Sequence, residues 1–316
     1  MQRPVPPGPP PAPVAQRLVI RYAKRGRMRF ASHRDIARAV ERGVRRAGLP
    51  VAYSAGFSPH PKISYSGGVS TCAASEAEYL EISLTGACAA PDVRDRLDAA
   101  LPDGIDVIEV FELAGASGTG PAGQPGAVAA QAEAADQAGA GGLRLEASEW
   151  RVVLPGVEPG DAARAVRAFL AVSSAPVDRL TSKGIRRLDA RPAVLMLELD
   201  RRAGEGRDAG CAILRMVVRH MTPAVRPDDI LAALGHVAAL TPSSPPLVTR
   251  LAQGPIGMVA AAAGNSVPGT PGPAGSPGPA GPSGPTPPVA AAPRPSAQGA
   301  AQGQKKATCP GAEAER

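Results

Sequence analysis

The chain has 316 residues, 44% of them apolar, which is enough for one large or two small domains with sizeable cores. Aromatic residues make up only 3%, so Leu, Val, Ile and Ala must fill those cores. No run of about 18 apolar residues is present, and the proline-rich start lacks the apolar stretch of a signal peptide. We therefore expect a cytoplasmic protein with no membrane partner.

The net charge of +7 is unevenly distributed. Residues 16–62 contain twelve Lys and Arg against two acidic residues, a local balance of +10, which leaves −3 for the remainder of the chain. This segregation indicates an anionic partner for the N-terminal region. The four cysteines form no CxxC pair and the four histidines form no HExxH motif, so we expect no metal and no cofactor.

Three segments are predicted to be unstructured, because they consist mainly of Ala, Gly, Pro and Gln: residues 1–15, 114–142 and 255–316. Two blocks, 16–113 and 143–254, are predicted to fold. In the first block the patterns indicate a strand at 17–23, a helix at 32–48, strands at 62–70 and 77–85, a helix at 91–101 and a strand at 105–113. Ser32 is the expected N-cap of the first helix, with Asp35 in a capping-box position.

The second block repeats this order. It predicts a strand at 150–154, a helix at 161–172, middle strands at 179–189 and 193–200, an additional strand at 211–221, a helix at 226–235 and a closing strand at 247–253. The order βαββαβ is that of the ferredoxin-like arrangement. The predicted fold class is therefore α+β, with two duplicated ferredoxin-like halves that pack on each other.

The first predicted helix carries Arg34, Arg38 and Arg42 on one exposed line, with Arg45 beside its end and Arg29 before its start. Like charges at this spacing destabilise a helix, so the line would gain from a polyanion. The alternative is that these arginines are simply solvated.

His33 lies in the first turn of that helix, where the dipole favours a neutral imidazole that could act as a general base. His60 lies between two prolines in a loop that leads to Lys62 and the next strand. We predict His33, His60 and Lys62 as candidate catalytic residues, with Lys62 also contacting phosphate, and the loop could face one cleft with the arginine line. The alternatives are a packing role for His33 and a rigid loop without a site.

In the second block, Lys183, Arg187 and Arg191 form a basic turn around Gly184 that could neutralise phosphates. Glu76, Glu78 and Glu81 could instead pair with these cations.

Several motifs carry a resemblance to a known family. They are RFASHRD (29–35), RRAGLPVAYS (45–54), GFSP (56–59), PKIS (61–64), SEAEYL (75–80), and Lys183 and Gly184 with Arg187, Asp189, Arg191 and Pro192. Over residues 16 to 254 the chain resembles the radical SAM-linked family of unknown function, in which the domain is fused to, or encoded beside, radical SAM enzymes. The chain lacks the CxxxCxxC triad of such enzymes, so it resembles the stand-alone form. Ala55 stands where the family pattern has Gln, which removes an amide from this motif.

The leading functional prediction is an accessory module for a radical SAM or RNA-modifying enzyme, which binds RNA or another polyanion through its basic residues. The resemblance implies a radical SAM protein as partner. One alternative is a metal-independent endoribonuclease that uses His33 or His60 as base and Lys62 to stabilise charge on phosphate. The other is a protein scaffold that does not contact nucleic acid.

Overall fold

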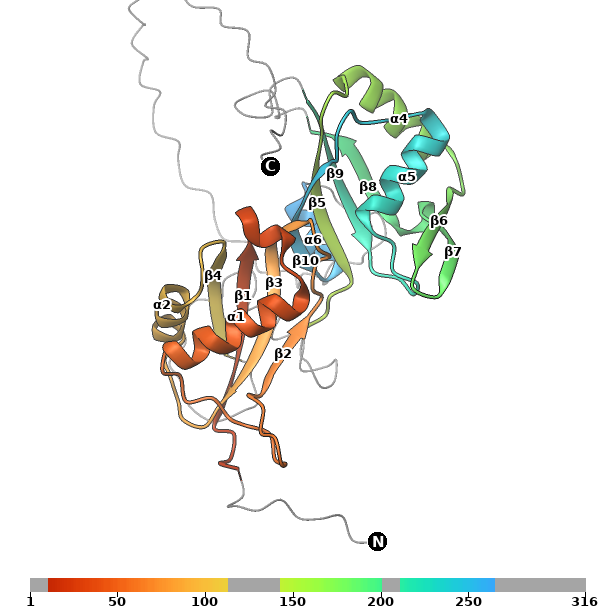
Figure 1. The fold of residues 1–316 in the computed structure, drawn as a ribbon. Helices are drawn as coiled ribbons and strands as arrows, with labels where there is room; N and C mark the ends of the chain where they lie inside the picture. The colour runs from red at the N-terminus through yellow and green to blue at the C-terminus, as the bar shows by residue number, and fades with distance from the viewer. Residues whose placement is uncertain (1–10, 113–142, 201–210, 265–316) are drawn as a thin grey trace, which may run out of the picture.

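The computed structural model describes residues 11–112, 143–200 and 211–264 (Figure 1). Eight strands form one mixed sheet in the order β4-β1-β3-β10-β5-β9-β8, and β2 also pairs with β3. The predicted unstructured segment 114–142 lies outside the described residues, as do most of the predicted N-terminal and C-terminal segments. No helix in the described ranges is long and apolar enough to cross a membrane.

The first half of the chain forms one end of this sheet. Its elements are β1 (Gln16–Lys24), a short 3-10 helix η1 (Gly26–Phe30), α1 (His33–Arg46), β2 (Ile63–Ser66), β3 (Ala74–Leu84), α2 (Ala90–Ala100) and β4 (Ile105–Glu112). The strands lie in the order β4-β1-β3-β2, and every neighbouring pair is antiparallel. The predicted elements of this half are therefore present in the predicted order.

The capping box at the start of α1 is confirmed. The hydroxyl of Ser32 accepts a hydrogen bond from the Asp35 amide at 3.3 Å, and the Asp35 carboxylate accepts one from the Ser32 amide at 3.1 Å. The Ser32 hydroxyl also donates to Asp35, and these bonds hold the pKa of Asp35 below its usual value. The helix begins here because both bonds satisfy amides that have no partner inside the helix.

The second half forms the other end of the sheet, in the order β10-β5-β9-β8. Its elements are β5 (Ala147–Leu154), α4 (Pro159–Ala171), β6 (Pro176–Thr181), β7 (Gly184–Asp189), η3 (Arg191–Ala193), β8 (Val194–Leu199), β9 (Ala212–Arg219), α5 (Pro227–Ala238), β10 (Leu247–Gly254) and α6 (Ile256–Ala262). Helix α6 follows β10 directly and continues the described chain beyond the predicted boundary at residue 254.

The prediction that residues 179–189 form a middle strand of the sheet is wrong. This segment belongs to β6 and β7, which pair only with each other in a separate two-stranded hairpin. The inner strand of the sheet is β9, which the sequence pattern presented as an additional strand. The physical reason is burial: β9 buries six of its eight residues, whereas β7 buries only Leu188, so β7 lacks the continuous apolar character of an inner strand.

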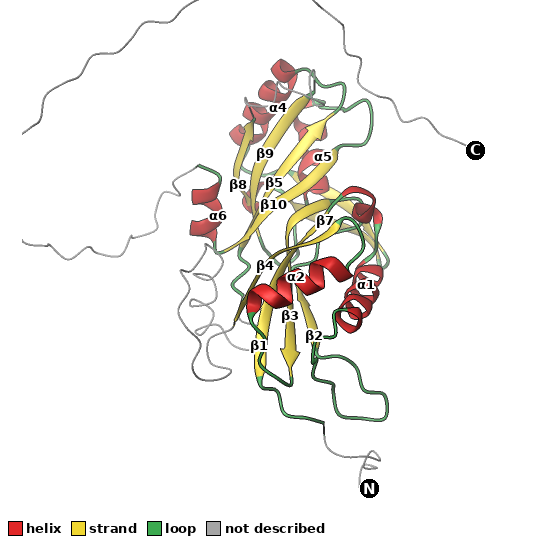
Figure 2. Ribbon diagram, turned by 90° about the vertical axis from the view of Figure 1, so that its left-hand side faces the viewer, coloured by secondary structure: helices red, strands yellow, loops and turns green. Residues whose placement is uncertain are grey.

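Helices cover the sheet on different faces. In the first half α1 and α2 pack on β1 and β3 around Leu18, Ile20 and Ile82, all fully buried. In the second half α4 and α5 pack on one face, whereas α6 packs on the opposite face against Met196 and Val217 (Figure 2). The two halves do not stack on each other as expected. They join edge to edge, because β10 pairs in parallel with the first residues of β3.

His220 is expected to make the stability of the protein dependent on pH. One ring nitrogen lies 2.7 Å from the hydroxyl of Ser148 in β5, and the other lies 2.7 Å from the carbonyl of Leu145. Partial burial lowers the pKa of His220 from its usual value of 6.5. Because the unfolded chain then binds the proton first, stability is complete above about pH 6.5 and falls as the pH decreases below that value.

The measurement is urea unfolding at a series of pH values from about 7.5 to about 5.5, around the unperturbed histidine pKa. We expect the His220→Gln variant to lose the decline that the unaltered protein shows. His60→Gln removes an exposed histidine and should retain the decline. An equal decline in His220→Gln would show that another group is responsible.

Candidate functional site

Helix α1 presents a row of exposed arginines without ion-pair partners among the described residues, which we call the basic face of α1. Ile36, Val40 and Val44 point into the core, and the opposite side of the helix carries five exposed arginines: Arg34, Arg38, Arg42, Arg45 and Arg46. Within the described part of the chain, none of the five forms an ion pair within 4.0 Å. The face therefore keeps its positive charge available to a ligand.

The acidic residues on β3 do not neutralise this face. Glu76 binds Arg25, Glu78 binds Arg250, and the Glu81 carboxylate lies 3.9 Å from the guanidinium of Arg17. The three glutamates do pair with arginines, but not with the cations of the basic turn that the sequence suggested. Their partners are strand and loop residues, and none belongs to α1 or to the basic turn at 183–191.

His33 lies at the first residue of α1, against the end of β2. Its ring packs edge-on to the ring of Tyr65, with centroids 5.2 Å apart. A Cβ added to Gly68 would lie 3.3 Å from Nδ1 of His33, so the ring also lies close to that backbone. The hydroxyl of Tyr65 is buried and has no hydrogen-bond partner among the described residues, and burial raises the pKa of Tyr65.

His60 and Lys62 lie at the other end of β2 and are exposed. The Ser54 amide donates to the His60 carbonyl at 2.9 Å, and the His60 amide donates to the Ser54 hydroxyl at 3.0 Å, which closes the loop before β2. His60 precedes β2 and Tyr65 lies within it, with four residues between the two, which corresponds to about 16 Å in an extended chain. The structure therefore does not bring His33 and His60 into one cleft.

Arg29 lies in the 3-10 helix η1, which precedes α1. Its guanidinium donates two hydrogen bonds to the Cys72 carbonyl, at 3.0 and 2.8 Å, and lies 5.5 Å from the ring centroid of Phe30. Arg29 thus holds the loop before β3 in place and lines the same end of α1 as His33.

The predicted basic residues of the second half lie apart from α1. Lys183 is exposed at the tip of the β6–β7 hairpin, and Arg187 lies 3.2 Å from the carboxylate of Asp178. Arg191 packs over the ring of Phe169 at 5.8 Å and donates to two backbone carbonyls of its own half. Lys183 and Arg187 thus face solvent, whereas Arg191 supports the fold around it.

A buried polar cluster joins the two halves, and sequence patterns gave no indication of it. We call it the junction cluster: Lys24, Ser75, Glu78, Arg250 and Gln253, each at most 4% exposed. Arg250 binds the carboxylate of Glu78, donates to Ser75 at 3.3 Å and to Gln253 at 3.1 Å, and lies over the ring of Trp150. Its partner Glu78 is 172 residues away in sequence, so no local pattern could reveal the pair.

Beside the junction cluster, a small cavity of about 170 Å³ separates the halves. Its walls include Cys72, Trp150 and Asp228. Lys24 lies behind this wall, where its ammonium donates to the Ser70 carbonyl at 3.4 Å and burial lowers its pKa. The pKa of Asp228 is raised because its carboxyl group is partly desolvated beside the cavity, although the residue as a whole is exposed. The cavity brings together a thiol and a carboxyl group, but it lies outside the basic face of α1.

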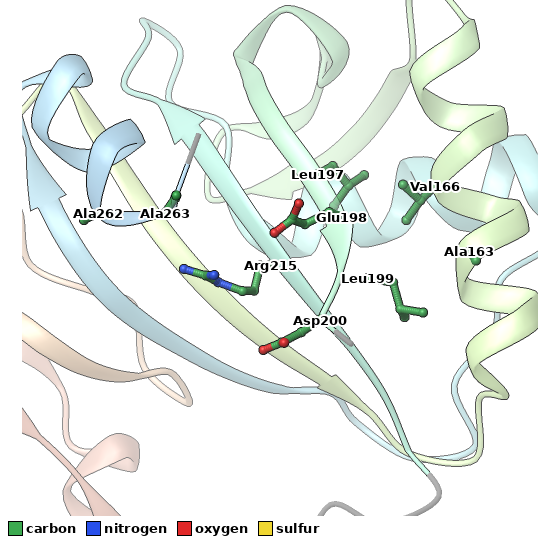
Figure 3. A pocket seen from close by; sticks show the side chains of 10 residues that line it. Ala163, Val166, Leu197, Glu198, Leu199, Asp200, Arg215, Ala262 and Ala263 are labelled. Carbon is green, nitrogen blue, oxygen red and sulfur yellow. The ribbon is translucent and has the colours of Figure 1, made fainter. Parts of the chain in front are cut away.

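A second cavity of about 640 Å³ lies along the outer strand β8, between α4 and α6 (Figure 3). Arg215 and Glu198 are opposite each other on β9 and β8, and Asp200 lies at the end of the same wall. Arg215 also binds Glu149, and this carboxylate raises the pKa of Arg215. No residue that the sequence pattern selected for a site lines this cavity.

Comparison with known proteins gives one result. No curated protein matches the chain. The sequence pattern of one family, described as an uncharacterized protein conserved in bacteria (DUF2344), matches residues 17–227. The matched range begins in β1 and ends at the first residue of α5, so it includes the basic face of α1 and most of the second half. The chain therefore belongs to the DUF2344 family of bacterial proteins.

Proposed function

We propose that this protein is an accessory module that binds RNA or another polyanion in the cytoplasm through the basic face of α1. One observation carries the proposal: five arginines on a single helix are exposed, and none forms an ion pair with a described residue. Arg29, in η1 before the helix, and the exposed Lys62, before β2, are the other cations of the first half that the proposal includes.

The positions of these arginines on the helix also favour the binding of an anionic ligand. Arg34 lies in the first turn of α1, where the positive end of the helix dipole disfavours a cation. Arg34, Arg38 and Arg42 repeat at four-residue spacing, which destabilises an isolated helix by about 0.2–0.5 kcal/mol for each like-charged pair. A row of phosphates would relieve both effects, because each phosphate supplies the missing negative charge.

The arrangement of the two halves suggests how this surface arose. When the β6–β7 hairpin is left out, the two halves have the same strand order in the sheet. In chain order, the fourth strand of each half lies beside the first, followed by the third and then the second: β4-β1-β3-β2 and β10-β5-β9-β8. We infer from this common order that the halves are two copies of a ferredoxin-like unit. Only the first copy then carries the arginine row, because α4 has just two exposed arginines, and Arg164 binds Asp161.

The test is binding of a labelled single-stranded RNA by fluorescence anisotropy between about 50 and 200 mM salt. If the five arginines each neutralise one phosphate, the logarithm of affinity falls against the logarithm of salt concentration with a slope of about −3.5, since each contact contributes about 0.7. We expect the Arg38→Glu/Arg42→Glu variant to bind more weakly and to reduce the slope to about −2.

The matched control is Arg164→Glu/Arg167→Glu, which makes the same change in charge on α4 of the second half. It should retain both the affinity and the slope of the unaltered protein. A slope near zero, or equal losses in the two double variants, would overturn the assignment of binding to α1.

The radical SAM partner is proposed on the sequence resemblance alone. Affinity capture from cells that is unchanged by nuclease treatment would support direct contact between the two proteins. Loss of the radical SAM protein after nuclease treatment would instead indicate that nucleic acid bridges the two.

A further inference from the structure

We propose that the basic face of α1 is one side of a site for single-stranded nucleic acid, in which Phe30 and Phe57 stack on unpaired bases. This inference rests on the proposed function and names its ligand class. The observation behind it concerns aromatic side chains, which are scarce in this protein: four Phe, four Tyr and one Trp.

Three aromatic side chains are exposed, and all three lie within residues 30–57, the stretch that also contains α1. Phe30 is 62% exposed, Phe57 67% and Tyr53 38%. The other Phe and Trp side chains, Phe111, Trp150 and Phe169, are at most 8% exposed. A protein with few aromatic residues for its core thus leaves two of its four phenylalanines in solvent, one just before α1 and one in the loop after it.

The surroundings of Phe30 and Phe57 suit a stacking role. The guanidinium of Arg29 lies 5.5 Å from the Phe30 ring centroid, so a cation and a free aromatic ring are presented together at the start of α1. Phe57 lies in the loop between α1 and β2, which projects from one end of the first half in Figure 1. The Ser54–His60 hydrogen bonds, the Tyr53–Pro61 bridge and the bond from the Lys62 amide to the Ala52 carbonyl at 2.8 Å close this loop.

Because this loop is already closed, little conformational entropy is lost when its aromatic side chain binds a ligand. Proteins that bind single strands combine a positive surface for the backbone with aromatic rings for the bases. A duplex keeps its bases stacked inside and offers only phosphates to the same surface. The site should therefore prefer single strands to duplexes, whereas arginines alone would favour the duplex with its higher charge density.

The experiment compares the full chain and its variants on an end-labelled single strand of about 12 nucleotides, as RNA and as DNA, and on the corresponding duplexes. We expect Phe30→Ala and Phe57→Ala each to weaken single-strand binding about fivefold or more and to leave duplex binding unchanged. Leu180→Ala and Ile185→Ala remove exposed apolar side chains of the second half and should change neither. The RNA and DNA arms show which of the two the site prefers.

A spectroscopic readout separates stacking from a loss of folding. Phe57→Trp places an indole on the exposed loop, whereas the native Trp150 is 8% exposed. The fluorescence of the introduced indole should be quenched by the single strand but not by inorganic polyphosphate. If the Arg38→Glu/Arg42→Glu variant loses binding while the phenylalanine variants bind normally and the introduced indole is not quenched, stacking is wrong and polyanion binding stands. If no form of the protein binds nucleic acid or inorganic polyphosphate, both proposals are wrong.

Discussion

Replacing Glu78 by Ala is expected to lower the free energy of unfolding by about 3–5 kcal/mol, because it leaves the guanidinium of Arg250 buried without its carboxylate. Both side chains are at most 5% exposed, so water cannot replace the missing partner. Glu78 also accepts a hydrogen bond from the Val69 amide at 3.1 Å, and this amide would lose its acceptor. Urea unfolding near neutral pH measures the loss.

Two further variants define the cause. Glu76→Ala removes a neighbouring glutamate whose partner Arg25 is half exposed, and it should cost no more than about 1 kcal/mol. In Glu78→Leu/Arg250→Met both charges are absent, and much of the lost stability should return because the guanidinium no longer lies buried without a carboxylate. Equal losses in Glu78→Ala and Glu76→Ala would show that the junction cluster does not stabilise the fold.

Asp229→Ala is expected to cost about 3 kcal/mol, since one carboxylate makes two kinds of contact. It accepts a hydrogen bond from the Arg226 amide at 2.6 Å at the start of α5, and it binds the guanidinium of Arg179 on β6. Asp229 is 6% exposed, so its removal uncaps the helix and releases the hairpin from α5 together.

Asp228→Ala is the control for this change, because Asp228 is the adjacent acidic residue in the first turn of α5 and is exposed. It should alter stability by no more than about 0.5 kcal/mol. Limited proteolysis within 176–189 should accelerate in Asp229→Ala alone. An unchanged rate would show that the ion pair with Asp229 does not hold the hairpin on α5.

Local signals predicted the first half well. Ser32 and Asp35 identify the start of α1 because both capping bonds form within four residues, and the arginine row follows from helical spacing alone. The second half was less predictable. The segment around Gly184 alternates like a strand, yet its outward residues Leu180 and Ile185 remain exposed, and no local pattern distinguishes a separate hairpin from a strand of the main sheet.

The candidate site likewise has features that local patterns predict and features that they do not. Exposure of the basic face follows from the position of each arginine on α1. The separation of His33 from His60 depends on β2, which lies between them, and the junction cluster depends on contacts between residues that are far apart in sequence. Charge patterns alone did not show that Glu78 forms an ion pair with Arg250, because the pairing of β3 with β10 brings the two residues together.

The late position of β10 in the chain has a consequence for synthesis on the ribosome. The first half can complete its own four strands as soon as β4 has emerged, but Glu78 and Lys24 must stay hydrated until Arg250 is made, 172 residues after Glu78. During that interval the edge of β3 around Ala74 and Ser75 has no neighbour from the second half. Until β10 is made, this edge carries the polar side chains of Ser75 and Glu78, and such side chains disfavour edge-to-edge association.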